Sequence, residues 1–221
     1  MFRRFLPIAA CVAIFFASVS LVGADPLYWD ILPGDGPTIS DGAGTWSDGS
    51  TNWNNGVGDV NWNNNAPAIA DFGSGTEVWG DLVVTVWDTV KASGIVSRKA
   101  YTFTNSLSDT IQLEGQTPSV RIADVTKFYV SIATGSGVES VNLAALGTST
   151  TPNKYLYLYA ENTFDAPLII GSDPEVAAGV LVMPSVLGAL GGSSTAGITV
   201  LPGSCLSIRA DSFSCAKPIT I

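Results

Sequence analysis

The sequence predicts an all-β repeat architecture in an exported protein, on three observations. Between residues 44 and 73, tryptophans alternate with Asn, Gly, Ser and Asp, and the tetrapeptide Asn-Trp-Asn-Asn at 52–55 recurs at 61–64. Such spacing gives turns that carry large aromatic anchors, and it leaves no apolar run long enough for a helix. From residue 76 onward, short apolar or β-branched segments alternate with Gly, Asn, Ser and Asp. The third observation is an export signal at the N-terminus.

The first 24 residues have the pattern of a cleavable signal peptide. Arg3 and Arg4 form a basic n-region, residues 5–22 are apolar and uncharged, and Val22-Gly23-Ala24 supplies small residues for cleavage. A permanent membrane anchor is the alternative, since the apolar stretch could span a bilayer with difficulty. Because a cut site closes the stretch, we expect secretion or a cell-surface location, with no stable membrane insertion after cleavage.

The composition argues against several classes of partner and chemistry. The chain has 10 basic and 19 acidic residues, and loss of Arg3 and Arg4 with the leader leaves 8 against 19, a net charge of −11. A dispersed anionic surface repels phosphate backbones and acidic polysaccharides, so nucleic acid binding is not expected. The sequence has no histidine, which removes Ser-His-Asp and Cys-His nucleophile systems and the usual His-rich metal sites. It also lacks a Walker loop and a dinucleotide fingerprint, so no cofactor is expected.

The segments after residue 76 predict strands in close succession. In the first segment, Val83, Thr85 and Trp87 share one face of the expected strand and alternate with apolar neighbours. The expected strands lie at 81–87, 94–97, 100–103, 110–113, 119–125, 127–132, 138–143, 154–160, 167–171, 179–183, 197–201, 204–208 and 218–221.

The segment at 154–160 has the cleanest alternation of the chain. Leu156 and Leu158 point to one side of the expected strand. Three tyrosines point to the other side: Tyr155, Tyr157 and Tyr159. We expect these tyrosines to pack as a ladder against a neighbouring layer, and a binding face is the alternative.

Two all-β folds fit these segments. A β-sandwich requires hairpins with short turns such as Asn-Gly, and Asn55-Gly56 is one such turn. A β-solenoid requires short, glycine-bounded strands whose inward residues pack on the coils before and after. Periodicity alone leaves both folds open.

The order of the Trp-rich motifs resembles the autotransporter-associated β-strand repeat family. These are secreted or surface proteins of bacteria that are similar to autotransporter passenger domains. Members often open with Gly-x-Trp, Asn-Trp, a second Trp and Asp/Ala-x-Phe-Gly. This chain has Gly44-Thr45-Trp46, Asn52-Trp53, Trp62 and Asp71-Phe72-Gly73 in that order.

The repeat motif of the same family also has a counterpart. It reads Leu-x-Leu, Asn-Thr-Tyr/Phe, Gly-x-Leu, Ala-Leu-Gly and Gly-x-x-Leu, and the matching segments are 156–158, 162–164, 179–181, 189–191 and 203–206. The chain departs from the family in having Asp165-Ala166 where Gly is usual, and in showing one clear copy of the repeat.

The resemblance implies a right-handed parallel β-helix, with the β-sandwich as the other fold. We expect a Trp/Asn-rich N-terminal cap region at 25–75 and a solenoid, shortened relative to the family, at 76–221. An uncapped solenoid edge at 218–221 would favour self-association.

The resemblance also implies a function. It predicts a non-enzymatic structural or adhesive role at the bacterial cell surface, with polysaccharide or other surface components as partners. The alternative is a carbohydrate-binding module in which Trp46, Trp53 and Trp62 stack on sugar rings while Asn side chains bond to hydroxyls. The same three rings could instead plug the open end of the solenoid, and we favour that cap.

A carboxylate enzyme is the weaker alternative, because two carboxylates suffice for glycoside cleavage. The candidates are Asp41, Asp48, Asp59 and Asp71. They are widely spaced and no basic residue occurs between residues 25 and 90, so we expect solvated turn carboxylates. The segment from Asp48 lacks the order of a calcium loop, and no metal site is expected.

Two cysteines remain after leader cleavage. Cys205 and Cys215 are ten residues apart and could close a small loop by a disulfide in an oxidising compartment. Two buried thiols on neighbouring strands are the alternative, and the sequence leaves both open.

Overall fold

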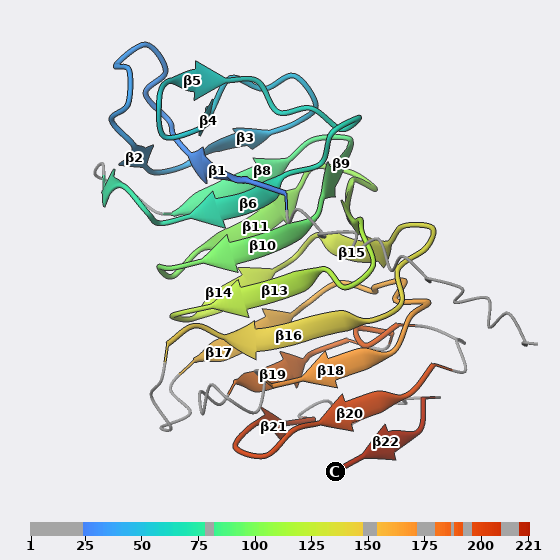
Figure 1. Ribbon diagram of the computed structural model, residues 1–221. Coiled ribbons are helices and arrows are strands. Elements are labelled where there is room, and N and C mark those ends of the chain that lie inside the picture. The colour runs from blue at the N-terminus through green and yellow to red at the C-terminus, as the bar shows by residue number, and fades with distance from the viewer. Residues whose placement is uncertain are drawn as a thin grey trace, which may run out of the picture.

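The computed structural model describes residues 24–77, 82–147, 154–171, 180–186, 188–191, 196–208 and 217–221. In these residues the fold is all-β, as predicted, and mostly parallel strands stack in columns around one core (Figure 1). The described residues include no helix long and apolar enough to cross a membrane. Residues 1–23 of the predicted leader lie outside the described residues.

The largest column is a ten-stranded sheet in the order β22-β20-β18-β16-β13-β10-β6-β1-β4-β5. Its pairs are parallel except β1 with β4 and β4 with β5, which are antiparallel. The strands are β1 (Pro26–Trp29), β4 (Trp53–Asn54), β5 (Asp59–Val60), β6 (Ile69–Phe72), β10 (Gly94–Ser97), β13 (Ser119–Ile122), β16 (Val141–Ala145), β18 (Leu168–Ile170), β20 (Ile198–Val200) and β22 (Ile219–Thr220).

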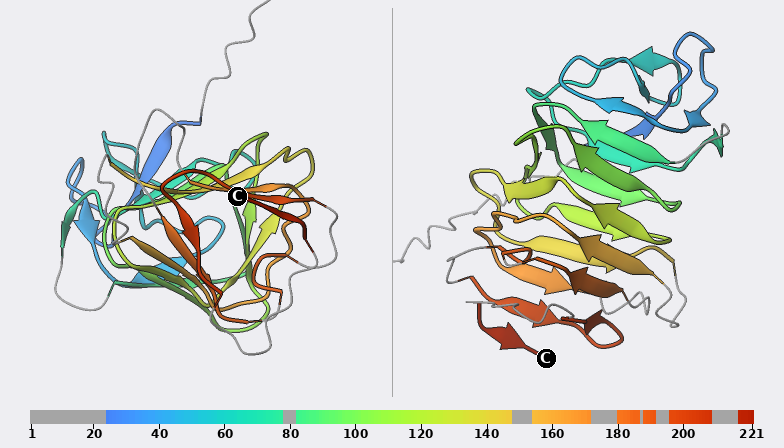
Figure 2. Two further views of the ribbon diagram at one scale, coloured as in Figure 1. Left: turned by 90° about the horizontal axis from the view of Figure 1, so that it is seen from below. Right: turned by 180° about the vertical axis from the view of Figure 1, so that it is seen from behind.

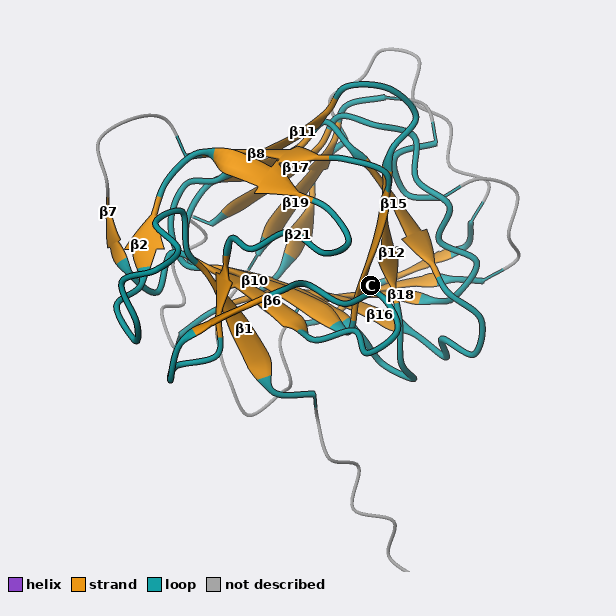
Figure 3. Cartoon of the chain, turned by 90° about the horizontal axis from the view of Figure 1, so that it is seen from above, coloured by secondary structure: helices purple, strands orange, loops and turns teal. Residues whose placement is uncertain are grey.

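A seven-stranded and a three-stranded sheet form the other two sides of the molecule (Figure 3). All of their strand pairs are parallel. The seven-stranded sheet contains β3 (Gly44–Trp46), β8 (Val83–Val86), β11 (Thr102–Asn105), β14 (Thr126–Phe128), β17 (Tyr155–Leu158), β19 (Leu181–Pro184) and β21 (Cys205–Leu206). The three-stranded sheet contains β9 (Thr89–Ala92), β12 (Thr110–Leu113) and β15 (Ser131–Thr134), and β2 (Ser40–Asp41) pairs with β7 (Thr76–Glu77).

The register identifies the fold as a solenoid. Ala70, Ile95 and Val120 lie side by side on adjacent strands, and each is 25 residues after the previous one (95 − 70 and 120 − 95). Each strand therefore pairs with its counterpart one coil away, whereas a sandwich would pair it with its neighbour in sequence. The predicted parallel β-helix is confirmed over the β-sandwich, and Figure 2 shows the stacked coils from below and from behind.

One hydrophobic core runs along the solenoid and holds the coils together. Inward residues stack in register from coil to coil, such as Val90, Ile111 and Ile132 in the three-stranded sheet, all at most 1% exposed. In the seven-stranded sheet, the rings of Phe103 and Phe128 stack with centroids 4.6 Å apart. Burial of such side chains contributes about 1.5–3 kcal/mol each, so apolar packing between successive coils is the main source of stability.

The predicted cap and solenoid share their sheets. β1 and β6, which lie in the predicted cap region, pair in parallel and continue into the ten-stranded sheet through β10. β3 likewise begins the seven-stranded sheet. No sheet boundary therefore falls between residues 75 and 76 in the part of the chain that the structure describes.

One predicted strand is two. The expected strand at 127–132 divides into β14 and β15, and the chain turns a corner between them. Phe128, Val130 and Ile132 remain inward and buried through the corner. Because the alternation continues while the backbone bends, the sequence pattern does not reveal the bend.

Candidate functional site

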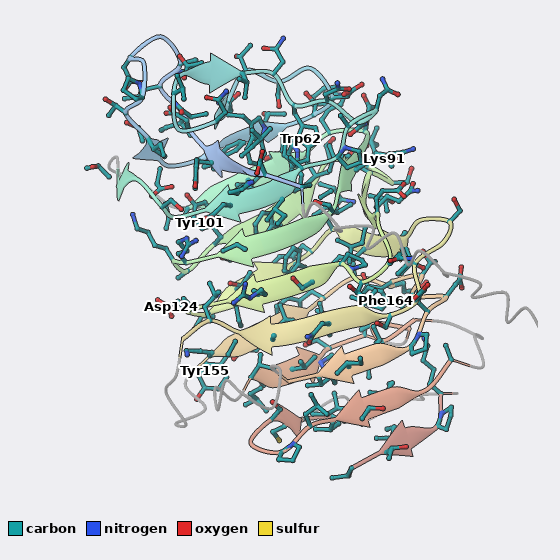
Figure 4. The ribbon with its side chains drawn as sticks, viewed as in Figure 1. Trp62, Lys91, Tyr101, Asp124, Tyr155 and Phe164 are labelled. Atoms are coloured by element: carbon teal, nitrogen blue, oxygen red, sulfur yellow. The ribbon has the colours of Figure 1, made fainter. Side chains whose placement is uncertain are left out.

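Four tryptophans fill the upper end of the solenoid. Trp29, Trp46, Trp53 and Trp62 are each at most 1% exposed. Trp53 contacts the other three, with ring centroids at 5.2 Å from Trp29, 5.4 Å from Trp46 and 4.4 Å from Trp62. Phe72 of β6 lies against this cluster, 5.4 Å from Trp53, and links it to the core of the first full coil. Figure 4 labels Trp62 at the top of the stack.

This burial corrects the glycan-contact hypothesis for the tryptophans. A sugar ring stacks on an exposed aromatic face, and Trp46, Trp53 and Trp62 present none. Their side chains instead cover the apolar end of the first coil, as an end cap must. Trp29 completes the cluster, and sequence reasoning missed it because it precedes the Trp/Asn motif by seventeen residues (46 − 29).

The Asn residues of the motif hold turns and an exposed strand edge. The Asn64 side chain accepts a hydrogen bond from the Lys91 amide at 2.8 Å and donates one to the Thr89 carbonyl at 2.8 Å. Its amide thus takes the place that a further strand would have above β9, the upper edge of the three-stranded sheet.

Asn162 plays the same part lower in the solenoid, at full burial. It is 3% exposed. Its Oδ1 accepts from the Ile132 amide at 2.7 Å, and its Nδ2 donates to the Ala189 carbonyl at 2.6 Å. These partners come from the coils on either side. The Asn-Thr-Phe motif is therefore a corner whose Asn joins three coils, while Phe164 is buried in the core.

Two of the candidate catalytic carboxylates are structural anchors. Asp41, fully buried, accepts hydrogen bonds from the Gly73 and Gly75 amides at 3.0 Å, from Lys99 Nζ at 2.8 Å and from the Tyr101 hydroxyl at 3.2 Å. Four donors occupy the carboxylate, which leaves it no role as a free base or nucleophile.

Asp71 is paired as fully as Asp41. Arg98 Nη2 donates to its Oδ2 at 2.7 Å and Arg98 Nε to its Oδ1 at 2.9 Å. This hydrogen bonding to Asp71 raises the pKa of Arg98. Both Arg98 and Lys99 come from the turn after β10. Although no basic residue occurs between residues 25 and 90, the next coil supplies the basic partners of these carboxylates.

Of the other two candidates, Asp48 lies in a turn and Asp59 lies in β5. Asp48 Oδ1 accepts from the Asn64 amide at 2.9 Å in an exposed turn, and Asp59 Oδ2 accepts from the Gly34 amide at 2.6 Å. The structure therefore brings no pair of the four candidates together as unpaired carboxylates.

One carboxylate cluster in the cap is close enough to hold a cation. Asp30, Asp35 and Asp59 each offer an oxygen, and these oxygens lie within 4.8 Å of one another. Burial raises the pKa of Asp30, and the nearby charge of Asp35 raises it further. The Asp30 carboxylate accepts from the amides of Leu32 and Ser40, each at 3.2 Å, so its hydrogen bonds already have a structural use.

The outer face of the seven-stranded sheet carries a row of tyrosines. Tyr155 and Tyr157 of β17 point outward while Leu156 and Leu158 are fully buried, as the alternation predicted. Tyr159 follows, and Tyr129 lies beside it from the coil above. We call Tyr129, Tyr155, Tyr157 and Tyr159 the tyrosine row; Tyr155, which begins β17, is labelled in Figure 4.

The rings of the tyrosine row pack on one another. The Tyr129 and Tyr159 rings stack with centroids 4.5 Å apart and planes 7° apart. Tyr157 is 5.6 Å from Tyr159 with planes 2° apart, and Tyr155 is 6.4 Å from Tyr157. Partial burial raises the pKa of Tyr159, and electrostatic interaction with Tyr129 and Tyr157 raises this pKa further. The expected ladder is present, but its rings stack on each other at the surface.

Trp87 adds a large aromatic side chain to the same side of the molecule. It follows β8 on the face shared with Thr85, as the alternation predicted, and is 56% exposed. Between Trp87 and the tyrosine row lie Thr85 and Thr104, with their hydroxyls 3.5 Å apart. Lys127 pairs in register with Thr102 and Tyr157. This face, which we call the aromatic face, is the best candidate for a functional surface.

The predicted disulfide stays a prediction. Cys205 lies in β21 and is exposed, whereas Cys215 lies outside the described residues.

Comparison with known proteins adds no family to this description. No protein-family model matches the chain, and no match was found among curated proteins or among solved structures. The resemblance to the autotransporter-associated β-strand repeat family therefore stays a prediction from the motifs.

Proposed function

We propose that this chain is an exported, non-enzymatic β-helical protein with a structural or adhesive role at the bacterial cell surface. The observation that carries the proposal is the division of side chains in the solenoid. Buried polar groups such as Asp41 and Asn162 are committed to holding turns and coils, while the aromatic face displays rings that the core does not require.

The ladder geometry supports a structural role. Parallel strands pair from coil to coil along the whole described solenoid, and one core cluster connects the Trp cap to Ile198 and Val200 near the other end. A repeat protein built this way is a rod whose stability comes from contacts between adjacent coils. Its sides are free to serve as extended contact surfaces.

The carboxylate geometry argues against the enzyme alternative. Glycoside cleavage needs two carboxylates facing each other across a substrate. Asp41 and Asp71 instead face Lys99 and Arg98 in ion pairs at 2.8 and 2.7 Å. Substitution of either carboxylate is therefore expected to change stability.

Export and surface location rest on the N-terminal sequence. The experiment that tests them uses the producing bacterium, in which the protein is followed by antibody on intact cells and by protease treatment of those cells. A deletion strain is then compared with its parent in attachment and in envelope integrity. We expect a surface-exposed protein without its leader and a deletion strain with weakened attachment or envelope. Protein that stays inside the cell, or a deletion without either defect, would overturn the proposal.

A further inference from the structure

We propose that the aromatic face binds a linear, uncharged polysaccharide. This inference rests on the proposed surface role and names the class of partner. The contact surface is Trp87 with the tyrosine row, supported by hydroxyls of the intervening strands. It replaces the buried tryptophans of the cap, whose rings a sugar does not reach.

The aromatic face exposes rings that the fold does not require. Trp87 is 56% exposed and Tyr129 is 46% exposed, and they are the most exposed aromatic side chains among the described residues. Trp87 directly follows β8 and Tyr129 directly follows β14, and both strands belong to the seven-stranded sheet. The inward alternation of the same strands already supplies the core with Val84, Val86 and Phe128. The outward rings are thus available for a partner.

The chemistry of the aromatic face matches a sugar polymer. A pyranose ring has apolar C–H faces, which pack on aromatic rings, and a rim of hydroxyls that donate and accept hydrogen bonds. On this face, large rings lie beside the hydroxyls of Thr85 and Thr104 and beside the phenol groups of the row. Few polar groups among aromatic side chains are typical of a site that orients a small-molecule or sugar ligand.

The charge of the face selects an uncharged polymer. Lys127 is the one charged side chain that the described strands of the seven-stranded sheet present outward. The chain as a whole carries a net charge of −9, so it repels nucleic acids and uronic acid polymers at a distance. A neutral glycan does not meet this repulsion.

The extent of the face suits a chain of several sugars. β8, which precedes Trp87, and β17, which carries the row, are separated by β11 and β14, a distance of about 14 Å at the usual strand spacing. Along β17, Tyr155 to Tyr159 spans about 13 Å. A single monosaccharide would cover only a fraction of this surface.

The test is binding of the exported protein to a panel of polymers by pull-down and affinity electrophoresis. The panel contains cellulose, xylan, β-1,3-glucan, chitin and starch as uncharged polymers, and alginate and DNA as charged ones. The double variant Trp87→Ala/Tyr129→Ala removes the two exposed rings without touching the core. Val57→Ala is the matched control, because Val57 is 81% exposed and lies in the loop between β4 and β5 of the cap.

We expect saturable binding to an uncharged polymer that is insensitive to salt and about tenfold weaker in the double variant. The Val57→Ala variant should bind as the parent does, and circular dichroism should show that all variants are folded. Absence of binding to every uncharged polymer, or binding unchanged by the double substitution, would overturn the inference. A parent dimer that the double substitution dissociates would also overturn it, because the face would then be a self-interface.

Failure here is distinguishable from failure of the proposed function. A protein that binds no polymer while its deletion strain still loses attachment leaves the surface role standing and removes the glycan. A protein retained inside the cell removes the surface role whatever the polymer panel shows.

Discussion

Substitution of Asn162 by alanine tests how the solenoid joins its coils. The Asn162 side chain bridges the Ile132 amide and the Ala189 carbonyl at 2.7 and 2.6 Å. Both groups lose their partner in Asn162→Ala, and the surrounding residues exclude water because Asn162 is 3% exposed. An unpaired buried polar group costs about 1–3 kcal/mol. We therefore expect a loss of about 3 kcal/mol in the free energy of unfolding.

Asn64→Ala is the matched control for this substitution. Asn64 makes an equivalent pair of hydrogen bonds, to the Lys91 amide and the Thr89 carbonyl, each at 2.8 Å. It lies at a partly exposed edge, where water can replace the lost side chain, so we expect a loss of about 1 kcal/mol.

Equilibrium unfolding of the protein in urea measures both losses, from the midpoints at a common slope. Equal losses in the two variants would refute the reasoning, because burial would then not decide the cost. A second variant, Asn162→Asp, sharpens the test. At neutral pH its carboxylate faces the Ala189 carbonyl without a proton to donate, so it should be destabilised, and the loss should shrink at low pH when the carboxyl is protonated.

Three further predictions concern the cap. Trp53→Ala should lower the free energy of unfolding by about 3–5 kcal/mol because it opens a cavity among buried rings. The exposed Trp87 is the comparison, and Trp87→Ala should change the same free energy by less than about 0.5 kcal/mol. Similar losses in the two variants would contradict the assigned burial. Asp41→Asn should cost about 2–3 kcal/mol in the same assay, since the ion pair with Lys99 is lost but Lys99 reaches water; a neutral effect would show that the pair is dispensable. Burial raises the pKa of Asp30 above its unfolded value near 3.8, so its contribution is present below that pH and lost as the pH rises through the folded pKa. Asp30→Asn should accordingly gain stability relative to the parent over that rise, and a pH-independent difference would refute it.

Much of the solenoid could be predicted because each strand is short and carries its own alternation of inward and outward residues. The segments expected at 94–97 and 110–113 coincide with β10 and β12. In β17, strict alternation of Leu and Tyr fixed the inward and outward sides. The Asn-Gly signal at Asn55 correctly indicated a reversal, since β4 and β5 are antiparallel.

The contacts of the cap could not be predicted in the same way. Lys99 reaches Asp41 over 58 residues, and nothing in the local sequence of either residue indicates the other. β1 was not expected as a strand, because Pro26–Trp29 has no alternating pattern of its own; it forms where β6 offers a parallel partner. The aromatic face combines Trp87 with tyrosines from later coils, so it exists only once the coil length sets their register.

The coil length has a mechanical consequence. Hydrogen bonds between parallel strands point along the solenoid axis, so tension applied to the two ends of the rod strains them one strand pair at a time. A coil that detaches releases about 25 residues, as from Ile95 to Val120 (120 − 95), and lengthens the tether by about 80–90 Å. Under tension the solenoid would thus yield in steps, and every step would dissipate work before the next coil detaches.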